Sequence, residues 1–461
     1  MFRLFKHYIP NAVLVLALVD FVLLLVSGEL GWLLRARQIG MDPGNVTQRW
    51  LPLLSYAVLT QLAMIAVGVY GSDALRSMRY ATARLLVAIS LGIIALSVFY
   101  FLLPGRTLWR SNLFYAMAIT IVLLVFVRLV LGNVLGTAPF RRRVLVLGAG
   151  ERAERLRQLA ERPEAGFLIV CFVTMSDQKP VIEEAINRTA IHNLTRFVDN
   201  LGVGEVVLAL EERRNALPLQ DLLRIKTTGV HVSDFSTFIE RETGRIDLDT
   251  VNPSWLIFSD GFSSGRIFSS VLKRLFDVFV SLVLMVVTLP LVIVFAVLVK
   301  LDSRGPAFFR QTRVGLYGET FNLIKLRSMR TDAEAAGAQF AQENDPRVTR
   351  IGRFIRKVRI DELPQVWTVL KGQMSFVGPR PERPEFVTDL EEKLPFYAER
   401  HMVKPGITGW AQINYPYGAS IEDSRHKLEY DLYYAKNYSP FLDLIILLQT
   451  LRVVIWREGA R

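Results

Sequence analysis

Four long apolar stretches constrain the fold of this chain more than any other feature. Each is about 20 residues long, enough for a helix to cross the roughly 30 Å of hydrocarbon in a bilayer. Inside lipid every backbone polar group needs a partner within the protein, which a helix provides. The sequence therefore predicts a four-helix transmembrane bundle, with both of its ends on one side of the membrane. The stretches are residues 12–34, 51–70, 81–103 and 113–131.

Charge and cysteine content limit the binding partners and the kinds of site that the chain can have. Lys and Arg total 55 against 43 Asp and Glu, a net charge of +12 that requires anionic partners such as phosphates, lipid headgroups or nucleic acid. The single cysteine, Cys171, excludes an intramolecular disulfide framework and a zinc site built from thiolates. Three arginines, residues 141–143, follow the fourth apolar stretch and favour a cytoplasmic continuation.

Residues 137–262 have the pattern of a soluble, Rossmann-like α/β domain. Short apolar runs at 144–147, 167–173 and 205–209 alternate with helical patterns, which favours a parallel sheet. Gly148 and Gly150 form a turn that could hold a diphosphate at a helix N-terminus. The run 167–173 lacks the acidic residue that holds a ribose, so a plain strand-to-helix turn is the favoured interpretation.

A fifth apolar run, residues 278–299, contains Pro290 near its middle and has basic residues at both ends. If this run crossed the bilayer, one basic cluster would face the wrong compartment. A helix that bends at Pro290 and returns to its starting face avoids this. We therefore expect a re-entrant membrane helix, the alternative being a spanning helix with a proline kink.

The next region, residues 300–359, is strongly basic, with thirteen Lys or Arg against six Asp or Glu. It leads directly into Asp361 and Glu362, followed by apolar residues at helical spacing. Asp361 is therefore expected at or near a helix N-terminus, where a plain capping role is the simplest alternative. The position of the basic stripe between a membrane segment and two carboxylates indicates a membrane-facing or phosphate-binding role.

A stiff arginine follows these carboxylates. Pro379 and Pro381 flank Arg380 and fix the backbone on either side of it, as a bidentate grip on phosphate requires. Adjacent carboxylates with such an arginine predict a diphosphate site that uses Mg²⁺, with Asp361 and Glu362 as metal ligands. The other cations that we assign to the substrate phosphates are Lys325, Arg327, Arg356 and Lys404.

These motifs resemble those of the polyprenyl-phosphate hexose-1-phosphate transferases, the large monotopic phosphoglycosyl transferases of bacteria. The first half of the chain resembles the larger members, and residues 238–249 resemble exopolysaccharide-associated ones. One departure is Leu289, where smaller relatives tend to have serine before the proline, although Thr288 offers a hydroxyl one residue earlier. The matching motifs are Lys273-Arg274-x-x-Asp277, Phe309-Arg310-Gln311-x-Arg313-x-Gly315, Lys325-x-x-Ser328-Met329, Asp361-Glu362-Leu363-Pro364-Gln365, Gly378-Pro379-Arg380-Pro381 and Lys404-Pro-Gly-Ile-Thr-Gly409.

The resemblance implies an enzyme of the bacterial inner membrane, multi-pass, with a cytoplasmic catalytic domain. It implies transfer of a sugar 1-phosphate from a UDP-sugar to polyprenyl (undecaprenyl) phosphate, with release of UMP and a covalent intermediate on Asp361. An aspartate of pKa about 3.9 is ionised at neutral pH and needs no general base. The partners that the resemblance implies for the protein are the UDP-sugar, the polyprenyl phosphate and the membrane, without nucleic acid. Homo-oligomerisation stays open. The implied domains are residues 1–136 (transmembrane), 137–262 (Rossmann-like) and 263–461 (re-entrant helix and catalytic α/β domain).

Two other functions compete with this one. A membrane-anchored, NAD-dependent nucleotide-sugar dehydratase or epimerase would use the glycine turn, but such enzymes often use Tyr-x-x-x-Lys. None of the fourteen tyrosines has a lysine four residues later. A non-catalytic scaffold for polysaccharide export that binds a nucleotide would leave residues 361–381 unexplained. Only the transferase releases UMP.

Overall fold

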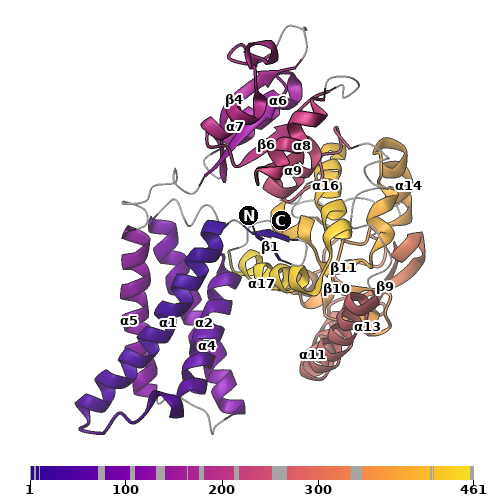
Figure 1. The fold of residues 1–461 in the computed structure, drawn as a ribbon. Helices are drawn as coiled ribbons and strands as arrows, with labels where there is room; N and C mark the ends of the chain where they lie inside the picture. Colours follow the sequence, from indigo (N-terminus) through magenta and orange to yellow (C-terminus); the bar gives the residue numbers. More distant parts are fainter. Residues whose placement is uncertain are drawn as a thin grey trace. The chain divides into compact units, whose positions relative to one another are not determined.

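In the computed structural model the chain forms two compact units, one ending at Gly244 and the other starting at Arg245. A few residues near the N-terminus are grouped with the second unit. Figure 1 shows the helices and strands of both units. Near the N-terminus, β1 (Phe2–Leu4) pairs with β2 (His7–Ile9). The structure describes residues 2–4, 7–9, 11–70, 78–103, 110–130, 141–162, 165–175, 181–211, 217–251, 267–333, 345–415, 418 and 420–456.

Long apolar helices occupy the four predicted N-terminal stretches. They are α1 (Asn11–Gln38), α2 (Trp50–Val67), α4 (Met78–Leu102) and α5 (Arg110–Val130), with a short 3₁₀ turn, η1 (Val46–Gln48), before α2. All four are long and apolar enough to cross a membrane. Helix α1 packs on α5 and α2, and α2 packs on α4.

A buried ion pair joins the first and last of these helices. Arg128 in α5 donates to both carboxylate oxygens of Asp20 in α1, at 3.1 and 2.7 Å, and both side chains are buried. Since a lone charge is costly in an apolar surrounding, this pair fixes the register of α1 against α5.

The predicted α/β domain is a five-stranded parallel sheet in the order β5-β4-β3-β6-β7. This order is that of a dinucleotide-binding half, with its switch point between β3 and β6. The predicted strands 144–147, 167–173 and 205–209 are confirmed with ends shifted by up to two residues. The strands are β3 (Arg142–Leu147), β4 (Phe167–Thr174), β5 (Ile186–Asn187), β6 (Glu205–Leu208) and β7 (His231–Asp234).

Apolar clusters cover both faces of this sheet, as a buried parallel sheet requires. One contains Ala153 and Leu156 of α6 with Phe238 of α9, and the other contains Leu194 of α7 with Ile225 of α8. The helices are α6 (Glu151–Glu161), α7 (Leu194–Asn200), α8 (Leu219–Thr227) and α9 (Phe235–Thr243), with the 3₁₀ turn η5 (Arg188–Ala190) before α7.

The fifth apolar run forms one continuous helix, α11 (Ile267–Asp302), with Pro290 inside it. Proline lacks the N–H that would bond the carbonyl four residues earlier. The Thr288 hydroxyl donates to the Leu284 carbonyl at 2.7 Å, whereas the carbonyl that faces Pro290 is that of Val286, so this hydrogen bond does not replace the one that the proline removes. Pro290 nevertheless does not end the helix, and the re-entrant path stays a prediction.

The C-terminal unit is built from small sheets and helices. Strands β8 (Phe308–Val314) and β9 (Thr320–Leu326) form an antiparallel hairpin through the turn η6 (Leu316–Gly318), and β10 (Ser375–Val377) runs parallel to β11 (Gly406–Thr408). The helices are α12 (Arg350–Lys357), η7 (Ile360–Glu362), α13 (Gln365–Leu370), α14 (Pro384–Lys393), η8 (Ala398–Met402), α15 (Trp410–Asn414), α16 (Ile421–Asn437) and α17 (Pro440–Trp456).

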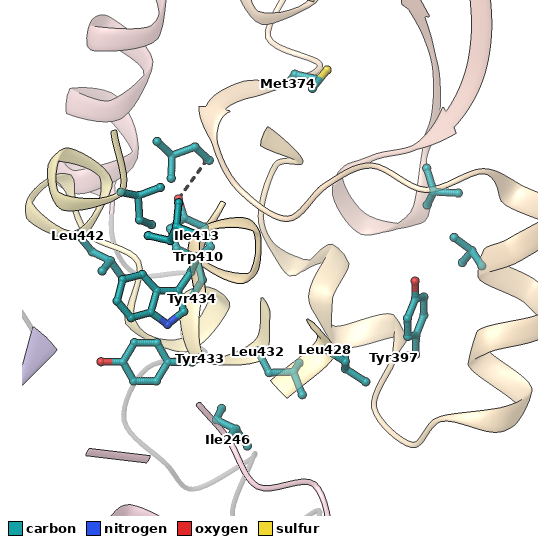
Figure 2. Close-up of a cluster of buried hydrophobic side chains, with 14 of the residues drawn as sticks. Ile246, Met374, Tyr397, Trp410, Ile413, Leu428, Leu432, Tyr433, Tyr434 and Leu442 are labelled. Carbon is teal, nitrogen blue, oxygen red and sulfur yellow. Dashed lines mark hydrogen bonds between the residues drawn. The ribbon is translucent and has the colours of Figure 1, made fainter. Parts of the chain in front are cut away.

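One apolar core holds this unit together (Figure 2). The rings of Trp410 and Tyr433 stack with their centroids 5.8 Å apart. Leu442 and Ile446 of α17 are fully buried in the core. These buried side chains show that the first half of α17 closes the core of this unit.

Residues 245–251 also pack with the C-terminal unit. Ile246 is buried in its core, and its N–H donates to the Glu429 carbonyl at 3.1 Å. The core of this unit therefore begins before the boundary predicted at 262/263. That boundary and the one at 136/137 both lie outside the described residues.

Candidate active site

The β8–β9 hairpin presents two cations on one face. Residues directly opposite in an antiparallel pair point to the same side, and Arg313 pairs with Phe321 while Lys325 pairs with Phe309. Alternation along β9 puts Phe321, Leu323 and Lys325 on that same side. Arg313, Leu323 and Lys325 accordingly line one pocket, together with Gln365 and Arg380.

Asp361 lies in a tight turn beside this pocket. Arg359 adopts the left-handed conformation, with φ of 59°, and the next three residues form the 3₁₀ turn η7. The predicted helix N-terminus is thus a 3₁₀ turn followed by the six-residue α13, and the helix dipole behind Asp361 is short. The side chain of Asp361 is buried, and its Oδ1 has no hydrogen-bond partner among the described residues.

Glu362 gathers three cations around one oxygen. Its Oε1 lies 3.4 Å from the Lys325 ammonium, 3.5 Å from the Arg359 guanidinium and 3.7 Å from that of Arg380. One carboxylate thus holds three positive groups, two of which, Lys325 and Arg380, line the pocket. With Asp361 counted as well, the cations still outnumber the carboxylates, so the group has charge to spare for an anionic ligand.

The two neighbouring carboxyls have opposite pKa shifts. Burial, and then the adjacent Glu362 carboxylate, raise the pKa of Asp361 to about 6. Burial would also raise the pKa of Glu362, but Lys325, Arg380 and Arg359 outweigh it and bring that pKa to about 2. Glu362 therefore stays ionised as the anchor of the cations, while burial disfavours the ionised form of the Asp361 carboxyl.

Arg380 follows β10 on a segment that touches β11 at a glycine. A Cβ on Gly378 would collide with the carbonyl oxygen of Lys404, so only glycine permits this approach. Pro379 and Pro381 then fix φ on either side of Arg380. The side chain of Arg380 is 40% exposed and reaches both Glu362 and the pocket.

Two contacts tie the first turns of α11 to β10. Lys273 donates to the Val377 carbonyl at 3.0 Å and to Asp443 at 2.5 Å. The Asp277 carboxylate accepts from the Ser375 hydroxyl at 3.1 Å and from the Phe376 N–H at 3.2 Å. The first matching motif of the chain therefore holds the membrane helix to the strand that precedes Arg380.

The structure corrects the phosphate-binding role that we predicted for Arg327. Strand β9 ends at Leu326, so the alternation that aims Lys325 into the pocket stops before Arg327. The buried guanidinium of Arg327 instead donates to the carbonyls of Ser303 at 2.7 Å and Arg304 at 3.2 Å. Arg327 thus caps the C-terminal end of α11.

Arg356 and Lys404 take different places. Arg356, in the last turn of α12, is half-buried, and its charge acts to lower the pKa of Asp361, so it belongs to the group. Lys404 is half-buried among Arg274, Asp277 and Lys273; burial, then Arg274, lower its pKa. The structure therefore places Lys404 by the start of α11, and not among the residues that line the pocket.

The glycine turn of the first unit is filled by a carboxylate of the chain itself. Gly148 has φ of 131° and lies at the switch point, where a Cβ would collide with the Ala209 carbonyl. Glu211, just past β6, accepts from the Glu151 N–H at 3.0 Å, and its Oε1 would touch a Cβ on Gly150 at 2.7 Å. The space for a diphosphate at the start of α6 therefore already holds a negative group.

Two polar side chains of the pocket, Arg313 and Gln365, lie within the matching motifs but were not predicted as site residues. Arg313 could have been found by pairing β8 with β9, because that register sets it beside Lys325. Gln365 is buried at the pocket, one turn beyond Asp361. The contact of Arg359 with Glu362 depends on its left-handed backbone, for which the sequence gives no signal.

Comparison with known proteins identifies the family of the chain. An uncharacterized sugar transferase of Haemophilus influenzae is 30% identical over 390 residues, 80% of each chain. Residues 268–457 match the family described as bacterial sugar transferase. The chain belongs to the bacterial sugar transferase family. That match contains Asp361, Glu362, Lys325 and Arg380.

Relatives with named activities match a shorter part of this sugar transferase. A UDP-N-acetylgalactosamine-undecaprenyl-phosphate N-acetylgalactosaminephosphotransferase of Aeromonas hydrophila is 42% identical over 52% of this chain and 56% of its own length. An undecaprenyl-phosphate glucose phosphotransferase of Komagataeibacter xylinus is 44% identical over 41% of this chain and 36% of its own. The chain thus spans about half the length of these curated relatives, or less.

A second family model overlaps the first half of this sugar transferase. Residues 65–230 match a family described as CoA-binding domain. Coenzyme A carries a diphosphate, for which the switch point of the sheet would be the expected position. The Glu211 carboxylate at the start of α6 occupies that position, so the turn does not fit this group.

Proposed function

We propose that this protein transfers a sugar 1-phosphate from a UDP-sugar to polyprenyl (undecaprenyl) phosphate, releases UMP and thereby initiates exopolysaccharide or related glycan assembly. The observation that carries the proposal is the buried Oδ1 of Asp361, which has no hydrogen-bond partner among the residues that the structure describes and which interacts electrostatically with Lys325, a cation of the pocket. The printed activities of the Aeromonas and Komagataeibacter relatives support it, since both act on undecaprenyl phosphate.

The proposed reaction has two displacements at one phosphorus. An Asp361 oxygen attacks the sugar-linked phosphorus, the bond to the bridging oxygen breaks, and its electron pair leaves with UMP. An oxygen of the lipid phosphate then attacks the same phosphorus and releases Asp361. Neither nucleophile carries a proton that must be removed, so no general base is required.

The cations of the pocket would overcome the repulsion between Asp361 and a diphosphate. Lys325, Arg313 and Arg380 line the pocket, and Arg356 adds its charge from α12. Because Glu362 holds Lys325 and Arg380 in place before substrate arrives, their charge is preorganised for the transition state.

The carboxylates fit Mg²⁺, which usually takes one or two carboxylates together with substrate phosphates. Oδ1 of Asp361 is a buried oxygen with no partner among the described residues, as a metal ligand requires. Glu362 would bind through Oε2, since its three cations all approach Oε1. When bound, Mg²⁺ would neutralise charge on the diphosphate.

We place the protein in the bacterial inner membrane as a multi-pass protein with a cytoplasmic catalytic unit, and we propose that α11 re-enters on that face. After Cys171 is replaced by serine, single cysteines at Ser270 and Arg304 should both react with a membrane-impermeant reagent from the cytoplasmic side. Labelling of the two positions from opposite sides would support a spanning helix instead.

Release of UMP tests the function. Purified protein is incubated with a panel of UDP-sugars, magnesium and polyprenyl phosphate, and UMP is measured. Release without the lipid acceptor, up to about one equivalent per active site, indicates a covalent intermediate. Absence of UMP with every donor would leave the dehydratase or export-scaffold functions.

A further inference from the structure

The segment that carries Arg380 is held at successive backbone carbonyls. The Gly406 N–H donates to the Pro379 carbonyl at 2.8 Å. The Arg400 guanidinium donates to the Arg380 carbonyl at 3.0 Å, and that of Arg313 donates to the Pro381 carbonyl at 3.0 Å. Two charged side chains therefore grip the peptide groups on either side of Pro381.

Arg400 is itself locked in place. Its Nε and Nη2 donate to Oδ2 of Asp431 at 3.1 and 2.7 Å, and its Nη1 donates to the Tyr397 hydroxyl at 2.9 Å. Arg400 is 5% exposed and Asp431 is 2% exposed. The pair joins η8 to α16 in the interior, and the Arg380 carbonyl accepts from its fixed guanidinium.

Stability alone does not explain this pair. Burying two charges costs solvation energy that their attraction barely offsets, and apolar residues of similar volume often serve as well. What apolar residues lack is a donor for the Arg380 carbonyl. Pro379 and Pro381 fix φ of their own residues, and Pro381 restricts Arg380 to extended backbone, but the peptide plane between Arg380 and Pro381 still has to be held.

We propose that Arg400, fixed by Asp431, is a positioning residue that sets the direction of the Arg380 side chain for grip on the substrate diphosphate. Arg400 orients the peptide plane after Arg380, which in turn sets where the Arg380 guanidinium lies in the pocket. This inference rests on the proposed function, in which Arg380 binds phosphate.

A double-mutant cycle with Arg380 tests the proposal. Arg400→Lys keeps the charge but has no planar fork to reach Asp431, Tyr397 and the Arg380 carbonyl together. We expect kcat/KM for the UDP-sugar to fall on the order of 10- to 100-fold, as for a small misplacement of a catalytic group. In the Arg380→Ala background the same substitution should change kcat/KM by less than about threefold, because the group that it positions is gone.

Two further variants distinguish loss of the positioning contact from misfolding of the catalytic unit. Arg400→Met with Asp431→Leu removes both charges, keeps the site apolar and leaves the Arg380 carbonyl without its donor, so it should fold and show the same loss. Arg245→Lys is the matched control: it alters an ion pair to Glu429 in the same unit, 3.1 Å long, that does not touch the Arg380 segment. Its kcat/KM should stay within about threefold of wild type.

The outcomes separate this proposal from the proposed function. If Arg400→Lys lowers kcat/KM equally with and without Arg380, the two residues act independently and the positioning role is wrong. Full activity of Arg400→Met with Asp431→Leu would overturn it as well. If wild type releases no UMP, the proposed function fails, and the same cycle is measured on equilibrium binding of UDP-glucose, where loss of coupling would overturn the positioning role.

Discussion

Two turns in this chain have the form of a phosphate site, and they differ in the charges that surround them. The turn from Gly148 to Gly150 has the glycines, the parallel sheet and the switch point of a nucleotide site, yet Glu211 accepts a hydrogen bond from the Glu151 N–H at the start of α6. The turn at Asp361 is followed by a helix of only six residues, α13, yet Lys325, Arg359 and Arg380 surround the neighbouring Glu362.

The difference teaches that uncompensated charge identifies an anion site better than backbone form. Glycines allow a close approach, but a tight turn needs them for packing as well, as the collision at Ala209 illustrates. A group of cations held by fewer carboxylates is costly to assemble and is stabilised by an anionic ligand. The predictions that follow test this comparison.

The largest effect is expected from Asp361→Asn. The amide keeps the shape of the side chain but removes the nucleophilic charge, so UMP release should fall by at least about 10³-fold. Mass spectrometry of wild type, incubated with UDP-sugar and magnesium but no acceptor, should find a hexose phosphate on the peptide that contains Asp361. Asp389→Asn, the same change at an exposed carboxylate on α14, is the control and should leave turnover unchanged.

Near-normal turnover of Asp361→Asn would remove the nucleophile from the proposed reaction. If UMP release always required the lipid acceptor and no adduct could be trapped, direct transfer between the two substrates would replace the covalent route.

A smaller loss is expected from Arg380→Ala. Removing one preorganised cation from developing phosphate charge should lower kcat by on the order of 10²- to 10³-fold, while traces of the Asp361 adduct still form. Arg383→Ala, three residues further on, is the control for loss of a nearby positive charge. Equal effects of the two substitutions would mean that net charge, and not the clamped position of Arg380, determines activity.

Asp361→Asn should also stabilise the folded protein. The folded pKa of about 6 lies above the unfolded value of about 3.9, so the stabilising contribution of this carboxyl is complete below pH ~4 and is lost as pH rises through about 6. Without magnesium, the variant should exceed wild type at pH 7.5 by up to about 3 kcal/mol in free energy of unfolding, the equivalent of two pKa units.

Thermal melts of both proteins in detergent, at pH 7.5 and near pH 4, measure this gain. The gain should be close to zero at the lower pH, where Asp361 is protonated in both states. A gain independent of pH would assign the effect to packing instead of charge.

No effect is expected at the glycine turn. Because Glu211 already bonds to the start of α6, the protein should not bind coenzyme A or NAD saturably below about 1 mM in equilibrium dialysis. Glu211→Gln should leave UMP release unchanged, since this turn takes no part in the proposed chemistry. Tight binding of either ligand by wild type would show that Glu211 moves aside, and the comparison between the two turns would lose its basis.

Much of the fold follows from local pattern. The apolar stretches and strands 144–147, 167–173 and 205–209 were predictable because periodicity and length are local properties. The sequence predicted one site that contains Asp361, Glu362, Lys325, Arg356 and Arg380, together with Arg327 and Lys404. The structure does not bring Arg327 into this group and places Lys404 by the start of α11. The other five are brought together by contacts or by electrostatic interaction around Asp361 and Glu362.

The remainder depends on partners distant in sequence. Arg327 differs from Lys325 only in lying past the end of β9, and its partners at Ser303 and Arg304 come from another element. Glu211 lies 60 residues from the N–H that it accepts from, so no window of sequence contains both. The sequence does not distinguish Arg400 from other basic residues, because its partners, the Arg380 carbonyl and Asp431, lie far from it along the chain.

The link between α11 and β10 has a geometric consequence for a protein that works at a bilayer. Lys273 and Asp277 hold the strand residues 375–377, and Arg380 comes three residues after that strand. If α11 inserts in the membrane as proposed, the depth at which it sits in the lipid determines the height of Arg380 above the membrane plane. A lipid phosphate is confined to a narrow range of depths in the bilayer, so this link would set the distance between Arg380 and the acceptor phosphate. Bilayers of different thickness would then change how well the acceptor reaches the site, although the residues of the site stay the same.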